Sequence, residues 1–458
     1  MLLCSRLPSS TPTTLRTMPP HGDQEVISRL SNELLLLVFN QNLPSATLAA
    51  CAQTCKSWNR LATAVLYKHV TLTSTRKLAS WSTATPPSLD ATVQTLTICV
   101  TKVQTATGPE DPAITMEELR QSLGRLQVRI SRMSELESLS ITTPKKLTRG
   151  LWVSNTAISK ILDNVPNKCL GLELVIRNGP YQASAEDAES HLCVAIRRLI
   201  PNLQFVRLAL PSLCSECFGY VSSVDSPASE PIFTAVELPK LRECIIILAS
   251  PKLGNNVERF DKPCNPDVSL ASVNAIVESL VSLAGLGKAP AIEKLWVYDC
   301  LPGSDDEGYS YGAFVRRDVL ANKSYTFPWN DIAPLKRADS FFIRMPEEEG
   351  GDDMITTRDN AACLVERHAW LTVGNGARLP AALMTKHGLH EQDCPVQTRT
   401  QWFESSKIST ALWKNESDTG MRLLHGESGD LLENRPAVFR IPESWERGVL
   451  GFLRKAEL

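Results

Sequence analysis

One short motif has the spacing of a catalytic nucleophile. Gly308-Tyr309-Ser310-Tyr311-Gly312 matches the G-x-S-x-G pattern of serine hydrolases, and histidines follow it in the chain. In those enzymes the serine stands between a buried strand and a helix, whereas here the polar run 302–307 precedes the motif. We therefore interpret 308–312 as a loop. An enzyme with its site around Ser310 or in the C-terminal region remains an alternative.

Two groups of Cys and His residues have spacings that metal ligands use. Cys214 and Cys217 form a C-x-x-C pair, and His387, His390 and Cys394 could supply three ligands. No second pair of ligands at a suitable spacing would complete a zinc site with Cys214 and Cys217. A His-x-x-His followed by Cys is common by chance. The chain also has neither a G-x-x-x-x-G-K-[ST] phosphate loop nor an H-E-x-x-H motif. We predict no metal site, no cofactor and no catalytic residues.

Composition excludes several classes of protein. The 458 residues carry 48 basic and 50 acidic side chains, so no net positive field favours nucleic acid or an anionic membrane. The apolar runs are far shorter than the roughly 20 residues that cross a bilayer, so we expect a soluble protein. The 13 cysteines are odd in number and often lie within apolar runs, as reduced thiols do. We therefore expect a cytoplasmic or nuclear location.

The stretch 25–72 has the strongest helical pattern. Apolar residues recur at spacings of three and four along its first helix, which Ser31 can cap, at Leu30, Leu34, Leu37 and Val38. A break at Leu43-Pro44-Ser45 precedes a second helix over about 46–55, and a third runs through Trp58 to Leu66. Such a small core is marginal alone, so we expect it to pack against a neighbour or a partner.

The rest of the chain divides into four further segments. We predict that residues 1–24 are a disordered leader, because their prolines argue against the amphipathic helix of a transit peptide, and that 73–91 are a linker.

The pattern predicts an irregular β-α repeat over residues 92–345, whose middle strand positions are Leu96, Leu139, Leu172, Val206, Cys244 and Leu295. Helical patterns lie between the strands, over 116–130, 157–165, 190–200 and 272–283. This predicts a solenoid or a parallel sheet with helices on one face, with an ordinary α/β domain as the alternative. The pattern fades after a last strand at 340–345, and we expect 346–458 to be a C-terminal cap or extension.

The helical stretch resembles a known family. It reads Leu30-Ser31-Asn32-Glu33-Leu34-Leu35, then Cys55-Lys56-Ser57-Trp58, and ends in Leu66-Tyr67-Lys68-His69-Val70. Together these runs resemble an F-box, especially the type found in fungal F-box proteins. The sequence departs from the family at Ser31, where Pro is usual, and at Thr54, where an aliphatic residue is usual. Ser31 can cap the helix that Pro would start, so we expect the fold to survive with a lower affinity for the adaptor.

The resemblance implies both a partner and a function. F-box proteins dock on a Skp-type adaptor, and through it on a cullin, while a second domain holds a protein substrate for ubiquitin transfer. The positions that match adaptor-facing or supporting residues of the family are Leu30, Leu34, Val38, Phe39, Leu43, Pro44 and Leu48, and Trp58 matches the F-box core. The expected fold is α/β overall, a small three-helix F-box followed by an irregular leucine-rich-repeat-like β-α solenoid. The expected function is a non-catalytic substrate receptor, with a scaffold that acts outside any ligase as the alternative.

Overall fold

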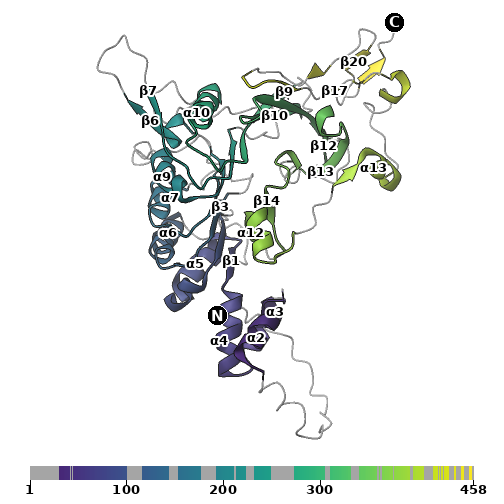
Figure 1. Cartoon of the computed structure of the whole chain (residues 1–458). Helices are drawn as coiled ribbons and strands as arrows, with labels where there is room; N and C mark the ends of the chain where they lie inside the picture. The colour runs from purple at the N-terminus through teal and green to yellow at the C-terminus, as the bar shows by residue number, and fades with distance from the viewer. Residues whose placement is uncertain are drawn as a thin grey trace.

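A 13-stranded sheet organises the computed structural model, and three short helices lie beyond its first edge (Figure 1). The structure describes residues 30–41, 43, 45–100, 116–143, 153–176, 192–210, 213–222, 232–248, 273–304, 310–331, 340–357, 361, 364–374, 376–391, 396–406, 416–420, 422, 424–425, 428–432, 438–439, 445–447 and 453–455. The expected leader, 1–24, lies outside these residues.

The three predicted N-terminal helices are confirmed. They are α2 (Asn32–Phe39), α3 (Ser45–Ala52) and α4 (Lys56–Leu66). Helix α3 ends three residues before the expected position because Cys55 adopts an extended conformation, with φ −157° and ψ 169°, and serves as the N-cap of α4. Ser31 caps α2 as predicted, since its side chain accepts a hydrogen bond from the Leu34 backbone N–H.

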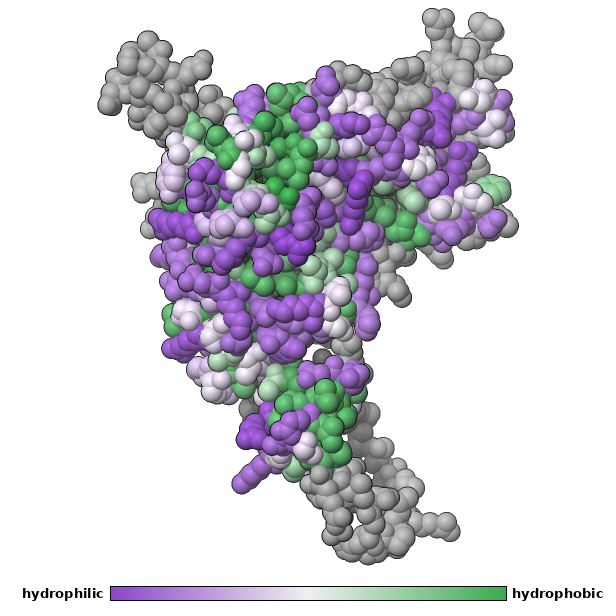
Figure 2. Space-filling view, viewed as in Figure 1, coloured by the Kyte–Doolittle hydropathy of each residue, from purple (hydrophilic) through white to green (hydrophobic). Residues whose placement is uncertain are grey.

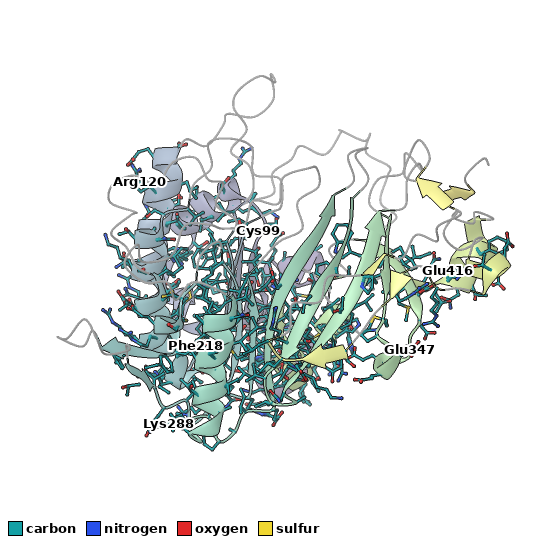
Figure 3. All side chains as sticks on the ribbon, turned by 90° about the horizontal axis from the view of Figure 1, so that it is seen from above. Cys99, Arg120, Phe218, Lys288, Glu347 and Glu416 are labelled. Atoms are coloured by element: carbon teal, nitrogen blue, oxygen red, sulfur yellow. The ribbon has the colours of Figure 1, made fainter. Side chains whose placement is uncertain are left out.

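The first half of the sheet is parallel. Its strands pair in the order β1 (His69–Leu72), β2 (Thr95–Cys99), β3 (Ser138–Thr142), β4 (Gly171–Val175), β5 (Phe205–Ala209), β8 (Glu243–Ile247) and β9 (Lys294–Ser304). The helices between them gather on one face: α5 (Thr75–Ala84), α6 (Met116–Ile130), α7 (Asn155–Leu162), α9 (Leu192–Leu199) and α10 (Val273–Gly285) (Figures 1 and 3). All six strands and all four helices predicted in this region are confirmed.

The segment predicted as a linker, 73–91, is part of the folded domain. It forms α5 and the 3-10 helix η1 (Pro87–Thr92), and Leu78 and Trp81 of α5 are buried in the main core. Buried Asp90 also accepts a hydrogen bond from Arg129 of α6 at 2.9 Å. The abundance of Ser, Thr and Pro concealed this helix, which Ser74 caps by accepting from the Lys77 backbone N–H.

Beyond β9 the sheet continues with antiparallel strands. These are β10 (Ser310–Asp318), β11 (Lys323–Asp331), β12 (Ser340–Arg344), β13 (Asp353–Thr357) and β16 (Gln397–Thr398), with β18 (Ser428–Asp430) beside β11. The predicted strand at 340–345 is confirmed. The expected loop over 308–312 is wrong for its second half, because Ser310 begins β10 and pairs with Ser304 of β9.

The C-terminal region does not simply extend the end of the sheet. Residues 364–391, which we call the strap, pass over the sheet face that the helices leave open, through β14 (Trp370–Thr372), β15 (Arg378–Pro380) and α12 (Ala381–Lys386) (Figure 1). The sheet is thus covered on both faces and does not close on itself. The α/β class is confirmed, but a solenoid is not established.

Smaller elements complete the fold. They are the 3-10 helices η2 (Ile200–Asn202), η3 (Ser215–Cys217) and η5 (Glu347–Glu349), helix α13 (Arg399–Ser406), and three strand pairs, β6 (Gly219–Ser222) with β7 (Ile232–Ala235), β17 (Leu424–His425) with β19 (Val438–Phe439), and β20 (Trp445–Arg447) with β21 (Leu453–Lys455). No helix within the described residues is both long and apolar enough to cross a membrane.

Candidate functional site

Helix α2 is apolar on two sides, and only one side is used inside the N-terminal module, residues 30–66. Leu35 and Phe39, four residues apart, point into the module core, where the ring of Phe39 meets the ring of Trp58 edge-on at 5.5 Å. The rest of this core consists of Leu48, Leu61 and Ala62, with half-buried residues packed against them. An apolar helix face is usually buried against another element, so the second apolar face of α2 lacks the cover that its composition favours.

The other face of α2 is an exposed apolar surface. Its side chains, between 40% and 60% exposed, are Leu34, Leu37 and Val38 of the helix and Leu30 just before it, and we call this set the docking face. Figure 2 shows hydrophobic residues gathered on the small N-terminal lobe, below the larger domain. Such a contiguous apolar patch on a small module marks an interaction surface.

The sequence-predicted residues of this module divide between its surface and its core. Leu30, Leu34 and Val38 lie on the docking face, whereas Phe39 and Leu48 are buried and can only support it from within. Leu43 is half-buried against the core, and Pro44 lies outside the described residues. The predicted set omitted Leu37, the most exposed side chain of the docking face, although its spacing from Leu34 and Val38 is the signal that finds it.

A second candidate surface is the sheet face beneath the strap. The register places Thr71, Thr97, Ser140, Glu173 and Arg207 side by side across β1 to β5, and we call them the polar row. Glu173 is fully buried, and Arg378 of the strap donates to its carboxylate at 2.6 and 2.8 Å. Burial acts to raise the pKa of Glu173, but Arg378, Arg207 and the Ser140 hydroxyl outweigh it and hold that pKa at about 2.

A histidine pair joins the end of the strap to the first strand. His387 packs edge-on against His69 of β1, with ring centroids 5.2 Å apart, and Glu137 lies 3.3 Å from His387 Nε2. Burial, together with the positive fields of His387 and Lys68, lowers the pKa of His69 to about 3. Burial also lowers the pKa of His387, with Lys68 and Lys386 acting in the same direction and Glu137 against it. Both rings are therefore neutral at pH 7.

The other Cys, His and Ser motifs of the sequence form no site among the residues that the structure describes. Cys214 and Cys217 are buried in the main core beside η3, and Ser310 begins a strand and not a helix. His390 is exposed and Cys394 lies outside the described residues. In the described part of the chain, no three His, Cys, Asp or Glu side chains are arranged to hold a metal ion.

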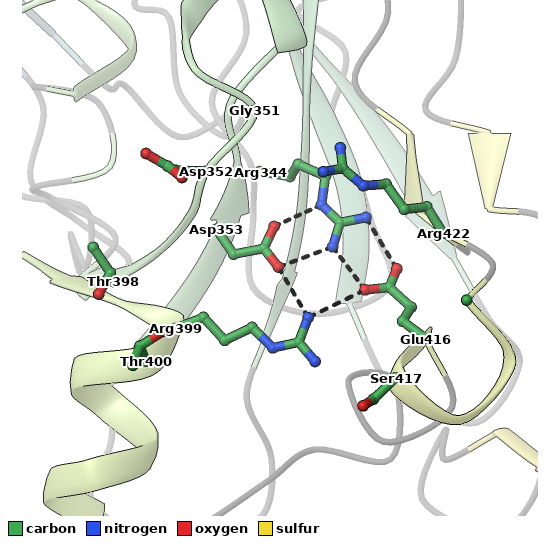
Figure 4. Close-up of a pocket in the computed structure, with 11 residues that line it drawn as sticks. Arg344, Gly351, Asp352, Asp353, Thr398, Arg399, Thr400, Glu416, Ser417 and Arg422 are labelled. Carbon is green, nitrogen blue, oxygen red and sulfur yellow. Dashed lines mark hydrogen bonds and ion pairs between the residues drawn. The ribbon is translucent and has the colours of Figure 1, made fainter.

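A polar cavity of about 500 Å³ lies near the C-terminal elements (Figure 4). Arg344 donates to Asp353 at 2.6 Å and to Glu416 at 2.8 Å, and Arg399 lies 3.6 Å from both carboxylates. Although burial opposes its charge, these two carboxylates raise the pKa of Arg344. Three arginines and three acidic residues line the cavity, the others being Arg422 and Asp352, so its charges are balanced. The network ties Arg399 and Glu416 to Arg344 of β12 and Asp353 of β13, and its balanced charges favour no ionic ligand.

Comparison with known families identifies the module. Residues 27–73 match the family model described as F-box-like, and this range contains α2, α3, α4 and β1. The chain carries an F-box-like domain. F-box domains generally bind Skp-type adaptors, and proteins that carry them are typically non-catalytic adaptors of ubiquitin ligases. The match covers about a tenth of the chain, and a search of curated proteins found no match.

Proposed function

We propose that this protein is the substrate-recognition subunit of a Skp-cullin-F-box ubiquitin ligase. The docking face of α2 binds the Skp-type adaptor, and the leucine-rich-repeat-like α/β domain, residues 69–391, binds a protein substrate. The protein itself performs no catalysis and acts in the cytoplasm or nucleus. The run Leu66-Tyr67-Lys68-His69-Val70 favours an F-box of the fungal type.

The observation that carries the proposal is the exposed apolar face of α2 within a domain that matches the F-box-like model. Its aliphatic side chains are about half exposed, so covering each of them on a partner contributes about 1 kcal/mol. An amphipathic helix that lays its apolar face into a partner groove is a common mode of recognition. The core beneath the docking face, with Phe39 against Trp58, holds α2 in place for that contact.

Co-purification with a Skp-type adaptor tests the docking face. A Leu34→Asp, Val38→Asp variant places two charges where the adaptor would bury apolar side chains, so we expect capture to be lost. Val128→Asp is the matched control, because Val128 lies on helix α6 with the same 50% exposure as Val38. Both variants should keep the wild-type circular dichroism spectrum, since neither changes a buried residue.

The outcomes separate the candidate functions. Capture by wild type and Val128→Asp, with loss in the double variant, supports adaptor binding through α2. Equal capture by all three proteins, or by none of them, contradicts it. Capture of adaptor and cullin without ubiquitin transfer to any bound protein would favour a scaffold that acts outside a ligase.

A further inference from the structure

The two faces of the parallel sheet differ in composition. On the helix-covered face, one row across seven strands is aliphatic throughout, with the members Leu72, Ile98, Ile141, Leu174, Leu208, Ile246 and Val297. The neighbouring row on the opposite face begins with the polar row and becomes apolar only at Ile245 and Trp296. Parallel strands that are covered on both faces usually read as continuous apolar runs. The polar row therefore has the composition of a surface built to meet water or a ligand.

The strap covers this polar surface with side chains of complementary charge. Arg378 pairs with Glu173, and Lys386 donates to Glu137 at 2.7 Å, so two basic side chains of the strap neutralise two acidic side chains of the sheet domain. Arg378 also donates its backbone N–H to the Thr97 hydroxyl at 2.8 Å. The first half of the strap contributes an acid, since Arg207 of the polar row donates to both carboxylate oxygens of Glu366 at 2.7 Å. Only the second half, residues 376–387, thus binds the sheet domain as a basic segment would.

The strap leaves two hydroxyl groups of the first strands without hydrogen-bond partners. The hydroxyls of Thr71 and Ser138 are buried and have no hydrogen-bond partner among the described residues. Both lie beneath the strap: the Cβ position at Gly376 is 3.4 Å from Thr71, and Ser138 lies beside Gly171, on which Pro380 packs. A buried hydroxyl without a partner destabilises the closed arrangement, and a ligand that supplies a hydrogen-bond partner would remove that cost.

Apolar contacts hold both halves of the strap on the sheet domain. Val365, Trp370 and Val373 of the first half, and Ala377, Leu379 and Leu383 of the second, belong to one buried apolar cluster with Phe205, Ile245 and Trp296 of the sheet. The Tyr298 hydroxyl donates to the Val365 carbonyl at 2.8 Å. Release of the basic side chains over β1 to β4 would therefore leave the strap attached over β5 to β9.

We propose that the polar row, with Glu137 beside it, is a binding surface for a segment of a partner protein that carries basic and apolar side chains as residues 376–387 do, and that this part of the strap occupies it as a built-in competitor. An arginine of the partner takes the place of Arg378 at Glu173, and a second basic side chain takes the place of Lys386 at Glu137. Because ion pairs are exchanged one for one, no buried carboxylate loses its partner during the exchange. This inference rests on the proposed substrate-receptor function and deepens it, by giving the substrate class and a means of regulation.

Peptide binding to the full chain tests this competition. The probe is a fluorescein-labelled peptide with the sequence of residues 376–387, Gly-Ala-Arg-Leu-Pro-Ala-Ala-Leu-Met-Thr-Lys-His. An Arg378→Ala, Lys386→Ala chain should bind it about tenfold more tightly than wild type by fluorescence anisotropy, because more of its binding surface is vacant. A probe with Ala in place of its Arg and Lys should not bind, and adding Glu173→Gln to the double variant should cancel the gain.

A matched control is Arg242→Ala, Lys288→Ala, which removes two basic side chains that form exposed ion pairs outside the strap. This control should bind the probe as wild type does. A folded Arg378→Ala, Lys386→Ala chain with no gain in affinity would overturn the proposal and make the strap a permanent part of the core.

Hydrogen exchange on the wild-type chain gives a second test that needs no variant. Millimolar probe should raise deuterium uptake at the backbone amides of residues 376–387 but not at those of β4, and unchanged uptake at both would contradict displacement. Neither experiment contains an adaptor. Failure of peptide binding therefore leaves adaptor capture intact, and failure of adaptor capture leaves peptide binding to be measured.

Discussion

The docking face of α2 and the polar row of the sheet are two candidate interaction surfaces with opposite properties. The first is apolar and open to solvent, whereas the second is polar and covered by the protein's own strap. An open apolar face gains free energy from almost any matching groove, so it suits a partner that stays bound. A polar row with buried charges discriminates among partners, since each charge needs an opposite charge in the correct position.

The largest expected effect comes from removing Glu173, the buried carboxylate of the covered surface. Glu173→Ala leaves Arg207 and Arg378 without their shared carboxylate and should destabilise the sheet domain by about 3–5 kcal/mol, near the upper end of that range. Urea unfolding measures the loss, and adaptor capture should be unchanged in native conditions. Glu293→Ala, which breaks an exposed pair with Arg242, should cost less than about 1 kcal/mol. Equal losses in the two variants would contradict the importance of the buried pair.

The corresponding change beneath the open surface is Phe39→Ala. Loss of the ring that packs on Trp58 should destabilise the N-terminal module by about 3 kcal/mol, the low end for a buried Phe, because a small module can relax around the cavity. Adaptor capture should fall with it, while the unfolding midpoint of the sheet domain stays the same. Leu37→Ala provides the contrast, since an exposed change should alter stability by less than about 0.5 kcal/mol and still weaken capture.

The stability of the sheet domain should depend on pH, whereas that of the N-terminal module should not show this dependence. The pKa of His69 falls from its usual 6.5 to about 3 in the folded chain, and that of His387 is also lowered. The unfolded chain therefore takes up protons below pH 6.5 that the folded chain does not, and stability falls as the pH drops from 6.5 towards 3. We expect His69 to contribute a loss that approaches about 1.4 kcal/mol per pH unit below pH 6.5, with a further loss from His387, measured by urea unfolding at pH 7, 6 and 5.

A His387→Gln variant checks the source of that slope. With His387 removed, the dependence of stability on pH should become weaker in this range, because its own proton uptake is lost and its positive field no longer lowers the pKa of His69. The module over 30–66 contains no histidine, so its unfolding should not follow this dependence. An unchanged slope in His387→Gln would locate the proton uptake elsewhere.

The smallest expected effect concerns the start of α2. Ser31→Ala removes the cap that accepts from the Leu34 N–H at 3.4 Å, and because that bond is long we expect a cost of about 0.5–1 kcal/mol to the module. Ser31→Asp should restore the cap and the stability, as read from the thermal midpoint of the module. A Ser31→Ala chain as stable as wild type would assign the start of α2 to other contacts.

Local sequence patterns predicted most of the elements but few of their long-range contacts. The strand positions from Leu96 to Leu295 and the helix over 116–130 follow from apolar spacing, which depends only on near neighbours. The alternation Thr95-Leu96-Thr97-Ile98 even indicates a sheet with one polar face. It does not indicate that Arg378, 281 residues after Thr97, covers that face.

The same limit applies to the docking site. Spacing in α2 identified the exposed Leu34 and Val38, but two apolar faces on one helix do not reveal which of them is inside. The resemblance places Phe39 and Leu48 in one set of adaptor-facing or supporting positions with Leu34 and Val38, and the structure assigns both to the core that also contains Leu35 and Leu61. Only the packing of α4 against α2 distinguishes the two faces.

The distance along the chain between Glu173 and Arg378, 205 residues, has a consequence for synthesis. At about 5–20 residues per second, a ribosome needs about 10–40 s to make Arg378 after Glu173. By the later part of that interval the N-terminal module and the strands that carry the polar row have been synthesised, and the polar row has no strap to cover it. A nascent chain is therefore open to both kinds of partner before the finished protein closes one of its two surfaces.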